Sequence, residues 1–189
     1  MTSTKNDFSK EEKYIDLCLE HGIDIDNRVI NFTGDLEEGY FQFFDFALTK
    51  MESINGKGIT IKINTFGGST YESFALVARL KESKCQIITK AYGKCMSAGF
   101  LILAAGDKRL ASKYCTMMHH GCAYSHPNDK YVQHKDYTNQ VNREEEMRFK
   151  LLAELTDKTQ SYWKKTAQYI DTYYTSEECL KLGVIDEIF

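Results

Sequence analysis

Short runs of alternating apolar and polar residues recur along the first 120 residues, and the first three are followed by stretches whose apolar positions have helical spacing. Strict alternation is typical of strands, and apolar residues three to four apart are typical of a helix with one buried face. The pattern predicts strands at 28–33, 58–64, 85–92, 108–111 and 115–119, and helices at 40–51, 71–81 and 97–105. Because strands alternate with helices, we expect an α/β domain with parallel strands.

The helix expected at 97–105 differs from the others because nearly all its residues are apolar. A helix that is hydrophobic all round is buried on all sides. The stretch before it, 93–96, begins with glycine and is predicted to be a loop.

A long stretch at about 130–156 contains neither Gly nor Pro and is rich in Glu, Lys, Arg and Gln. A helix of about 26 residues rises ~40 Å, more than the ~30 Å that spans a small domain, so we expect it to project. Its apolar positions are sparse in the first half and dense in the second. This distribution fits an arm that docks on another subunit and fits a solvated surface helix equally well.

The composition indicates one domain. The 189 residues are 42% hydrophobic and carry a net charge of −3, so a single core at 28–189, preceded by a polar segment at 1–27, accounts for the chain. Positive and negative residues are interspersed, which argues against nucleic acid as a partner. No apolar run approaches the ~20 residues of a membrane span, and the polar start has no secretory signal character, so we expect a cytoplasmic protein.

The six cysteines are scattered without a Cys-x-x-Cys pair. This spacing favours reduced, buried thiols over a disulfide framework or a zinc site. No cluster of His, Asp or Glu has metal-ligand spacing, and we expect no metal.

Ser97 stands where the loop meets the first turn of the buried helix. Unpaired N–H groups at a helix start stabilise a developing oxyanion, so a nucleophile would suit this position. Serine is also a common helix N-cap, and the local sequence does not separate the two interpretations.

Two further features accompany this serine. The pair Gly67 and Gly68 follows the strand at 58–64, where missing Cβ atoms allow close approach to the backbone and leave N–H groups available as donors. His119 and His120 end the strand at 115–119, and because adjacent strand residues face opposite ways, only one of them can face a given site as a general base.

Four segments, in order, carry a pattern that is specific when taken together: INTFGGS at 63–69, MSAGFLILAAG at 96–106, MMHH at 117–120 and TSEECLKLGVIDEIF at 175–189. From about residue 28 to the C-terminus the chain resembles ClpP, the family of proteolytic subunits of the Clp protease. The resemblance implies an α/β fold of the ClpP/crotonase-like ββα spiral type, with a projecting handle helix at about 130–156.

The resemblance also implies a serine endopeptidase that needs neither metal nor cofactor. Ser97 matches the family nucleophile and His120 its general base. The nearest carboxylate to the family's third position is Asp171. The backbone N–H groups of Gly68 and Ala98 match its oxyanion-hole donors.

In the family, two heptameric rings stack into a barrel, and an AAA+ unfoldase of the ClpX, ClpA or ClpC type feeds unfolded polypeptides into it. Segment 1–27 matches the family poorly and falls where the family has its axial loops. Phe66 replaces the usual Pro and Ala98 the usual Met, which bears on substrate preference. A catalytically inactive ClpP-like structural or regulatory subunit is the main alternative, and an acyl-CoA hydratase or isomerase on the same spiral fold is a third.

Overall fold

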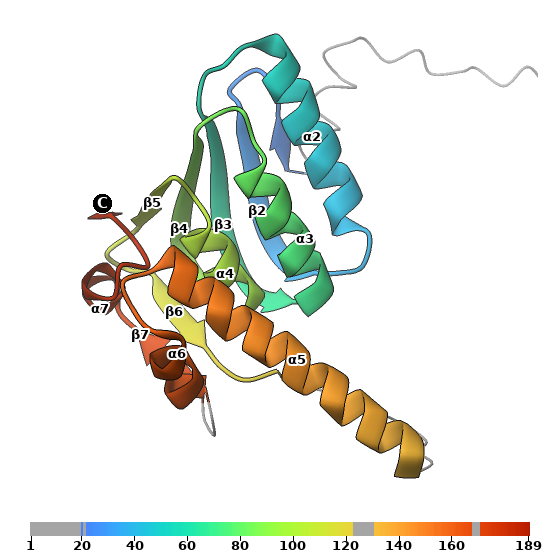
Figure 1. The fold of residues 1–189 in the computed structure, drawn as a ribbon. Coiled ribbons are helices and arrows are strands. Elements are labelled where there is room, and N and C mark those ends of the chain that lie inside the picture. Colours follow the sequence, from blue (N-terminus) through green and yellow to red (C-terminus); the bar gives the residue numbers. More distant parts are fainter. Residues whose placement is uncertain (1–19, 21, 123–130, 168–170) are drawn as a thin grey trace, which may run out of the picture.

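The structure is a computed structural model that describes residues 20, 22–122, 131–167 and 171–189 (Figure 1). Most of the expected axial segment at 1–27 lies outside the described residues. The elements are β1 (Ile23–Asp24), β2 (Val29–Leu36), α2 (Tyr40–Ile54), β3 (Ile59–Gly68), α3 (Thr70–Lys81), β4 (Ile87–Met96), α4 (Ala98–Ala104), β5 (Lys108–Ala111), β6 (Thr116–His119), α5 (Tyr131–Leu155), α6 (Gln160–Ala167), β7 (Thr172–Tyr174), α7 (Ser176–Lys181) and β8 (Glu187–Ile188).

One sheet organises the domain, in the order β1-β2-β3-β4-β5-β8, with β6 beside β4 and β7 beside β6. The pairings from β2 through β5 to β8 are parallel, as the strand and helix alternation predicted. The pairs β1–β2 and β6–β7 are antiparallel. Because β1 joins the sheet, the segment before residue 28 contributes to the domain.

The long strand β4 has two partners. Its first part pairs with β5, and its last part, Lys94 to Met96, pairs with Thr116 to Met118 of β6. The loop predicted at 93–96 is therefore wrong, because hydrogen bonding to β6 keeps this stretch extended. The switch of partner makes β4 the strand that leads directly into the site described below.

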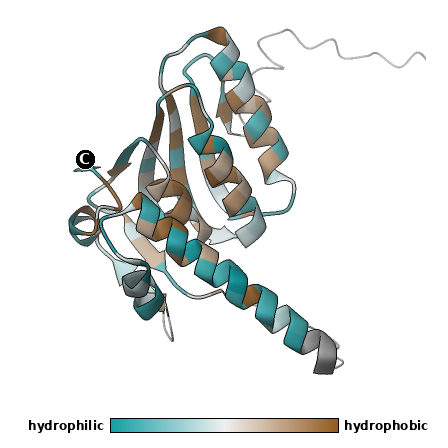
Figure 2. Ribbon diagram, in the orientation of Figure 1, coloured by the Kyte–Doolittle hydropathy of each residue, from teal (hydrophilic) through white to brown (hydrophobic). Residues whose placement is uncertain are grey.

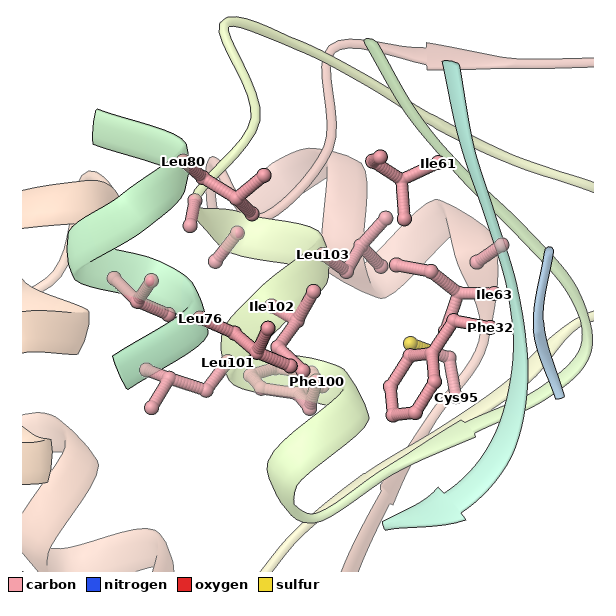
Figure 3. Close-up of a cluster of buried hydrophobic side chains, with 14 of the residues drawn as sticks. Phe32, Ile61, Ile63, Leu76, Leu80, Cys95, Phe100, Leu101, Ile102 and Leu103 are labelled. Carbon is pink, nitrogen blue, oxygen red and sulfur yellow. The ribbon is translucent and has the colours of Figure 1, made fainter. Parts of the chain in front are cut away.

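Helices α2 and α3 lie over the same face of the sheet, and α4 lies between α3 and the strands β3 and β4 (Figure 1). All seven residues of α4 are buried, as its apolar composition predicted. Figure 3 shows Leu101 and Leu103 among side chains from β2, β3 and α3, including the fully buried Phe32. Because α4 is buried on all sides, it gives rigid support to the residues at its N-terminus.

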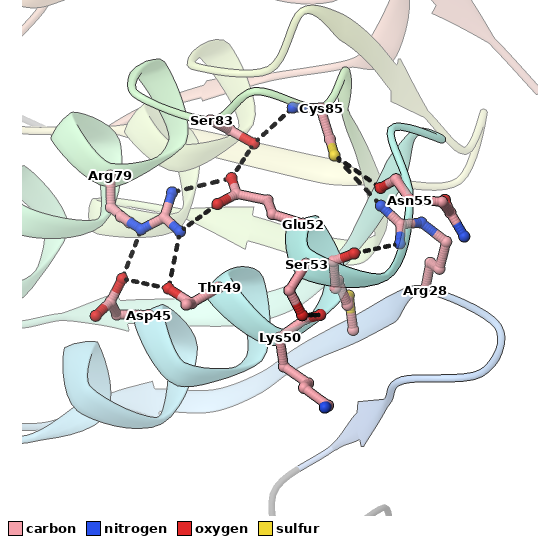
Figure 4. A network of polar contacts seen from close by, with 11 residues as sticks. Arg28, Asp45, Thr49, Lys50, Glu52, Ser53, Asn55, Arg79, Ser83 and Cys85 are labelled. Atoms are coloured by element: carbon pink, nitrogen blue, oxygen red, sulfur yellow. Dashed lines mark hydrogen bonds and ion pairs between the residues drawn. The ribbon is translucent and has the colours of Figure 1, made fainter.

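Two arginines fasten α2 to its surroundings (Figure 4). Arg28 is buried and donates hydrogen bonds to the carbonyl groups of Met51 and Lys57, both at 2.6 Å. Arg79 of α3 contacts Glu52 and Asp45 of α2 at 2.9 and 2.5 Å. The Arg79 contacts tie α2 to α3, and the Arg28 contacts hold the last turns of α2 and the loop after it.

Helix α5 runs from the body of the domain outward (Figure 1), as the length of the polar stretch predicted. Its colouring in Figure 2 is mainly hydrophilic. Phe149 and Leu152 are buried in the core of the domain, Val141 is also buried, and Met147 is 53% exposed. The apolar residues of its second half thus serve first to dock the helix on its own domain.

Within the described residues, none of the helices combines the length and apolar character of a membrane span. The same part of the chain contains no group of three or more His, Cys, Asp or Glu residues arranged to hold a metal ion. Its five cysteines, Cys85, Cys95, Cys115, Cys122 and Cys179, are all free thiols.

Candidate active site

Ser97 lies between β4 and α4 in a strained backbone conformation, with φ +53° and ψ −118°. Non-glycine residues rarely adopt positive φ, and such strain persists only where the surrounding structure enforces it. Here the Ser97 N–H donates to the carbonyl of Met118 on β6 at 2.9 Å, and buried α4 follows directly. The Ser97 side chain makes no capping hydrogen bond within the described residues, so the N-cap interpretation does not describe this serine.

His120 follows the last residue of β6 and meets this serine. Its Nε2 lies 2.7 Å from Ser97 Oγ. The register of the β4–β6 pair explains the meeting, because Met96 faces Met118 and each strand ends within two residues of the group it delivers. The structure brings Ser97 and His120 together.

His119 points elsewhere, as strand alternation requires. It is 2% exposed, its Nε2 lies 3.3 Å from the Trp163 carbonyl, and its ring packs against Phe100 and Phe149. Burial, and secondarily the positive charge of Arg148, lower its pKa to about 3. His119 is therefore a neutral core residue that does not face Ser97.

Asp171 completes a line of three groups. One of its carboxylate oxygens lies 3.4 Å from Nδ1 of His120, on the ring edge opposite Ser97. Strand β7 pairs antiparallel with β6 so that Thr172 faces His119, which places residue 171 beside residue 120. The Asp171 side chain is 51% exposed, so water screens this contact in part.

Burial is the main cause that lowers the pKa of His120 below its usual value, and the positive charge of Arg148 lowers it further. The negative charge of Asp171 and a hydrogen bond to it act in the opposite direction. The net direction keeps the imidazole neutral near pH 7, the form that can accept a proton.

The two glycines predicted to admit close approach lie directly against the serine. Gly67 has φ +114°, and a Cβ placed on it would lie 2.7 Å from Ser97 Cβ and 3.1 Å from the Ala98 nitrogen. Gly68 has φ +140°, and a Cβ there would collide with the backbone of Leu36. Both positions therefore require glycine, and the end of β3 packs against the start of α4 as a result.

Arg148 of α5, which lies near both histidines, was not among the predicted site residues. It stands seven residues after Val141 and four before Leu152, at the spacing of the buried face, and it is only 6% exposed. A charged residue at an apolar position of an amphipathic helix was the signal available in the sequence. Its neighbour Glu145 was missed as well; its Oε1 accepts the Cys122 N–H at 2.8 Å.

Comparison with known proteins gives the family of the chain and supports its fold. The family model described as Clp protease matches residues 23–189. ATP-dependent Clp protease proteolytic subunit 2 of Prochlorococcus marinus (strain NATL2A) is 26% identical over 187 residues, covering 95% of this chain and 90% of the relative. The chloroplastic proteolytic subunit 6 of Arabidopsis thaliana is 28% identical over 173 residues, covering 85% of this chain and 59% of that protein.

Among solved structures, a point mutant of ClpP1 from Listeria monocytogenes superimposes with a TM-score of 0.79 at 24% identity, covering 87% of this chain and 92% of that one. This likeness shows that the fold expected from the sequence, a ClpP-type α/β fold, is correct. Since the family model spans everything from β1 to the C-terminus, the chain belongs to the Clp protease family.

Proposed function

We propose that this chain is the serine endopeptidase subunit of a ClpP-like barrel protease, with Ser97 as nucleophile, His120 as general base and Asp171 as the acid that orients the imidazole. The observation that carries the proposal is the 2.7 Å contact between Ser97 Oγ and His120 Nε2 at the start of a fully buried helix. Nucleophile and base within hydrogen-bond reach, with the base oriented by a third group, is the arrangement that acyl transfer requires.

The reaction starts with the proton of His120 on Nδ1, which faces Asp171, so that Nε2 accepts the hydrogen bond from the Ser97 hydroxyl. Ser97 Oγ attacks the carbonyl carbon of the substrate while Nε2 takes the hydroxyl proton. The imidazolium then gives that proton to the leaving amine, and an acyl-enzyme remains on Ser97. Water, deprotonated by the same Nε2, attacks the acyl carbon and releases the second product.

The N–H groups of Gly68 and Ala98 are the proposed donors to the oxyanion. Support comes from the packing of the glycine pair against Ser97 and Ala98, and from the position of Ala98 as the first residue of α4. Donors held rigidly where charge develops are the largest single contribution in many enzymes of this class.

The proposal extends to assembly and partners. The two relatives are named as proteolytic subunits of ATP-dependent Clp proteases. We infer by analogy that this chain assembles into stacked rings of seven through α5 and receives unfolded polypeptides from an AAA+ ATPase. Cytoplasmic localisation belongs to the same proposal.

A fluorophosphonate probe tests the central claim, because it forms a covalent bond only with an activated serine. We expect labelling that maps to Ser97 by peptide mass spectrometry and disappears in Ser97→Ala. An assembled oligomer that is not labelled and cleaves no peptide would indicate the inactive structural subunit instead. Binding of an acyl-CoA in place of labelling would indicate the hydratase or isomerase.

A further inference from the structure

The guanidinium of Arg148 is buried, lies 5.4 Å from the centre of the Phe149 ring, and lacks part of the hydrogen-bond partners that such a group needs. Its side chain is 7% exposed, and its Nε and NH2 atoms have no hydrogen-bond partner within the described residues. The nearest carboxylate oxygen, on Glu145, lies 3.9 Å from NH2, beyond hydrogen-bond distance. That oxygen already accepts the N–H of Cys122.

A buried donor without an acceptor is costly, and a charged one more so. Arg cannot escape this cost by losing its proton at physiological pH. An apolar residue of similar volume at this position would stabilise the isolated chain. The unused N–H donors therefore point to an acceptor other than the described residues, and the acceptor that matches a guanidinium is a carboxylate.

The position of Arg148 relates it to the proposed catalytic groups. Its charge contributes to lowering the pKa of His120, so it lies within electrostatic reach of that imidazole. Glu145 connects it to the chain directly after the histidine, because this carboxylate binds the N–H of Cys122 and would contact a Cβ on Gly121. The guanidinium thus lies beside the segment that carries His120.

The orientation of Arg148 argues against a second copy of the chain as the source of the acceptor. Arg148 lies on the buried face of α5, between Val141 and Leu152, in the half that docks on its own domain. The outward face of the same half carries Met147, which is 53% exposed, and Lys150, whose side chain is 71% exposed. A protein partner would meet that outward face, whereas the guanidinium faces the domain that carries His120.

We propose that Arg148 is a specificity-determining residue that binds a carboxylate side chain of the substrate next to the cleaved bond, so that this subunit prefers Glu or Asp at the position whose carbonyl Ser97 attacks. The inference rests on the proposed function and narrows its substrate class to acidic peptides. Glu145, Cys122 and the neutral His119 and His120 are the other ionisable groups near the guanidinium, and the NH2 donor has no hydrogen-bond partner among the described residues.

The test compares fluorogenic peptides that differ only in Glu or Gln before the cleaved bond, using the full-length assembled protein. We expect kcat/KM to favour Glu by about ten- to a hundredfold, the range for a charge-assisted hydrogen bond. Arg148→Leu should abolish or reverse this preference, Arg148→Lys should retain part of it, and the matched control Lys150→Leu should keep all of it. Arg148→Leu should also unfold at the same or a higher temperature, which separates lost selectivity from misfolding.

A binding measurement makes the inference independent of turnover. In the Ser97→Ala background, fluorescence anisotropy should show a fluorescein-labelled peptide ending in Glu amide binding more tightly than its Gln counterpart, and Arg148→Leu should remove the difference.

Equal binding of the two peptides, or equal kcat/KM with Ser97 still labelled by fluorophosphonate, overturns the inference and leaves the proposed function intact. Arg148-dependent binding without labelling or cleavage in the wild-type chain would instead keep the anion site and refute the peptidase. A change of oligomeric state in Arg148→Leu, with selectivity unchanged, would assign the guanidinium to a subunit contact.

Discussion

Replacing Asp171 by Asn tests whether the carboxylate beside His120 contributes to catalysis. The substitution keeps the size and shape of the side chain, removes its charge and replaces one acceptor oxygen by an NH2 donor. In the transition state His120 becomes an imidazolium, and its Nδ1 lies 3.4 Å from the Asp171 carboxylate. The lost stabilisation is therefore the attraction between these two charges.

Coulomb's law sets the size of the effect. At 3.4 Å, opposite unit charges attract by about 1.2 kcal/mol in a medium as polar as water and by about 5 kcal/mol at an effective dielectric constant of 20. Because Asp171 is 51% exposed, screening keeps the value well below the upper figure. At 1.36 kcal/mol per factor of ten, we expect kcat/KM to fall about 10- to 1000-fold.

The assay is hydrolysis of a fluorogenic peptide by assembled wild-type and Asp171→Asn protein between pH 5 and 9. Activity should rise with pH as His120 loses its proton, with the midpoint below the usual histidine pKa because burial lowers it. Since Asp171 raises that pKa, its removal should move the midpoint to lower pH while the plateau falls. Unchanged kcat/KM in Asp171→Asn, with the exposed control Glu177→Gln also unchanged, would refute a catalytic role for this carboxylate.

Three further expectations concern the support of the site. Gly67→Ala should abolish fluorophosphonate labelling and lower the free energy of unfolding by about 1–3 kcal/mol, because φ is +114° and the new Cβ collides with the proposed nucleophile. The control Gly56→Ala, at a position with open space around it, should leave labelling unchanged. In the unfolded chain His119 gains a proton near its usual pKa, well above the folded value of about 3, so the free energy of unfolding should fall by about 1.4 kcal/mol per pH unit as the pH drops below ~6.5. His119→Phe should flatten that slope in urea titrations. An unaltered slope would contradict a neutral, buried His119. Leu103→Ala should cost about 2–5 kcal/mol in the same titrations because the side chain is fully buried, whereas a comparable loss in Leu180→Ala, 43% exposed, would show that burial does not set the cost.

Much of the fold could be predicted from local patterns. Strand alternation, the helical spacing at 40–51 and 71–81, and the apolar run at 97–105 depend on which face each residue buries, and burial dominates the energetics of these elements. The prediction of a loop at 93–96 was wrong because it relied on the local glycine, whereas the stretch is held extended by β6, which comes about 20 residues later in the chain. A pairing over that distance leaves no local signature.

The candidate site divides in the same way. Strand parity indicated that only one of His119 and His120 faces a given site, because alternate residues of a strand face opposite sides, and the resemblance to the family selected His120. The pairing of β6 with β7, which brings Asp171 to His120, joins segments about 50 residues apart and appears only in the folded chain. Local periodicity thus determined which side chains are buried and which can reach a site.

Only the tertiary structure decided which of those groups meet, and it alone revealed the surroundings of Arg148. The spacing from Val141 and Leu152 places a charge at an apolar position of the helix, but that pattern does not show which groups surround the guanidinium. Its significance arises because α5 docks against the domain with that residue facing inward, where water no longer satisfies the guanidinium. Strand and helix periodicity depends on residues that are close along the chain, whereas the burial of a charged group without hydrogen-bond partners depends on residues that are close in space.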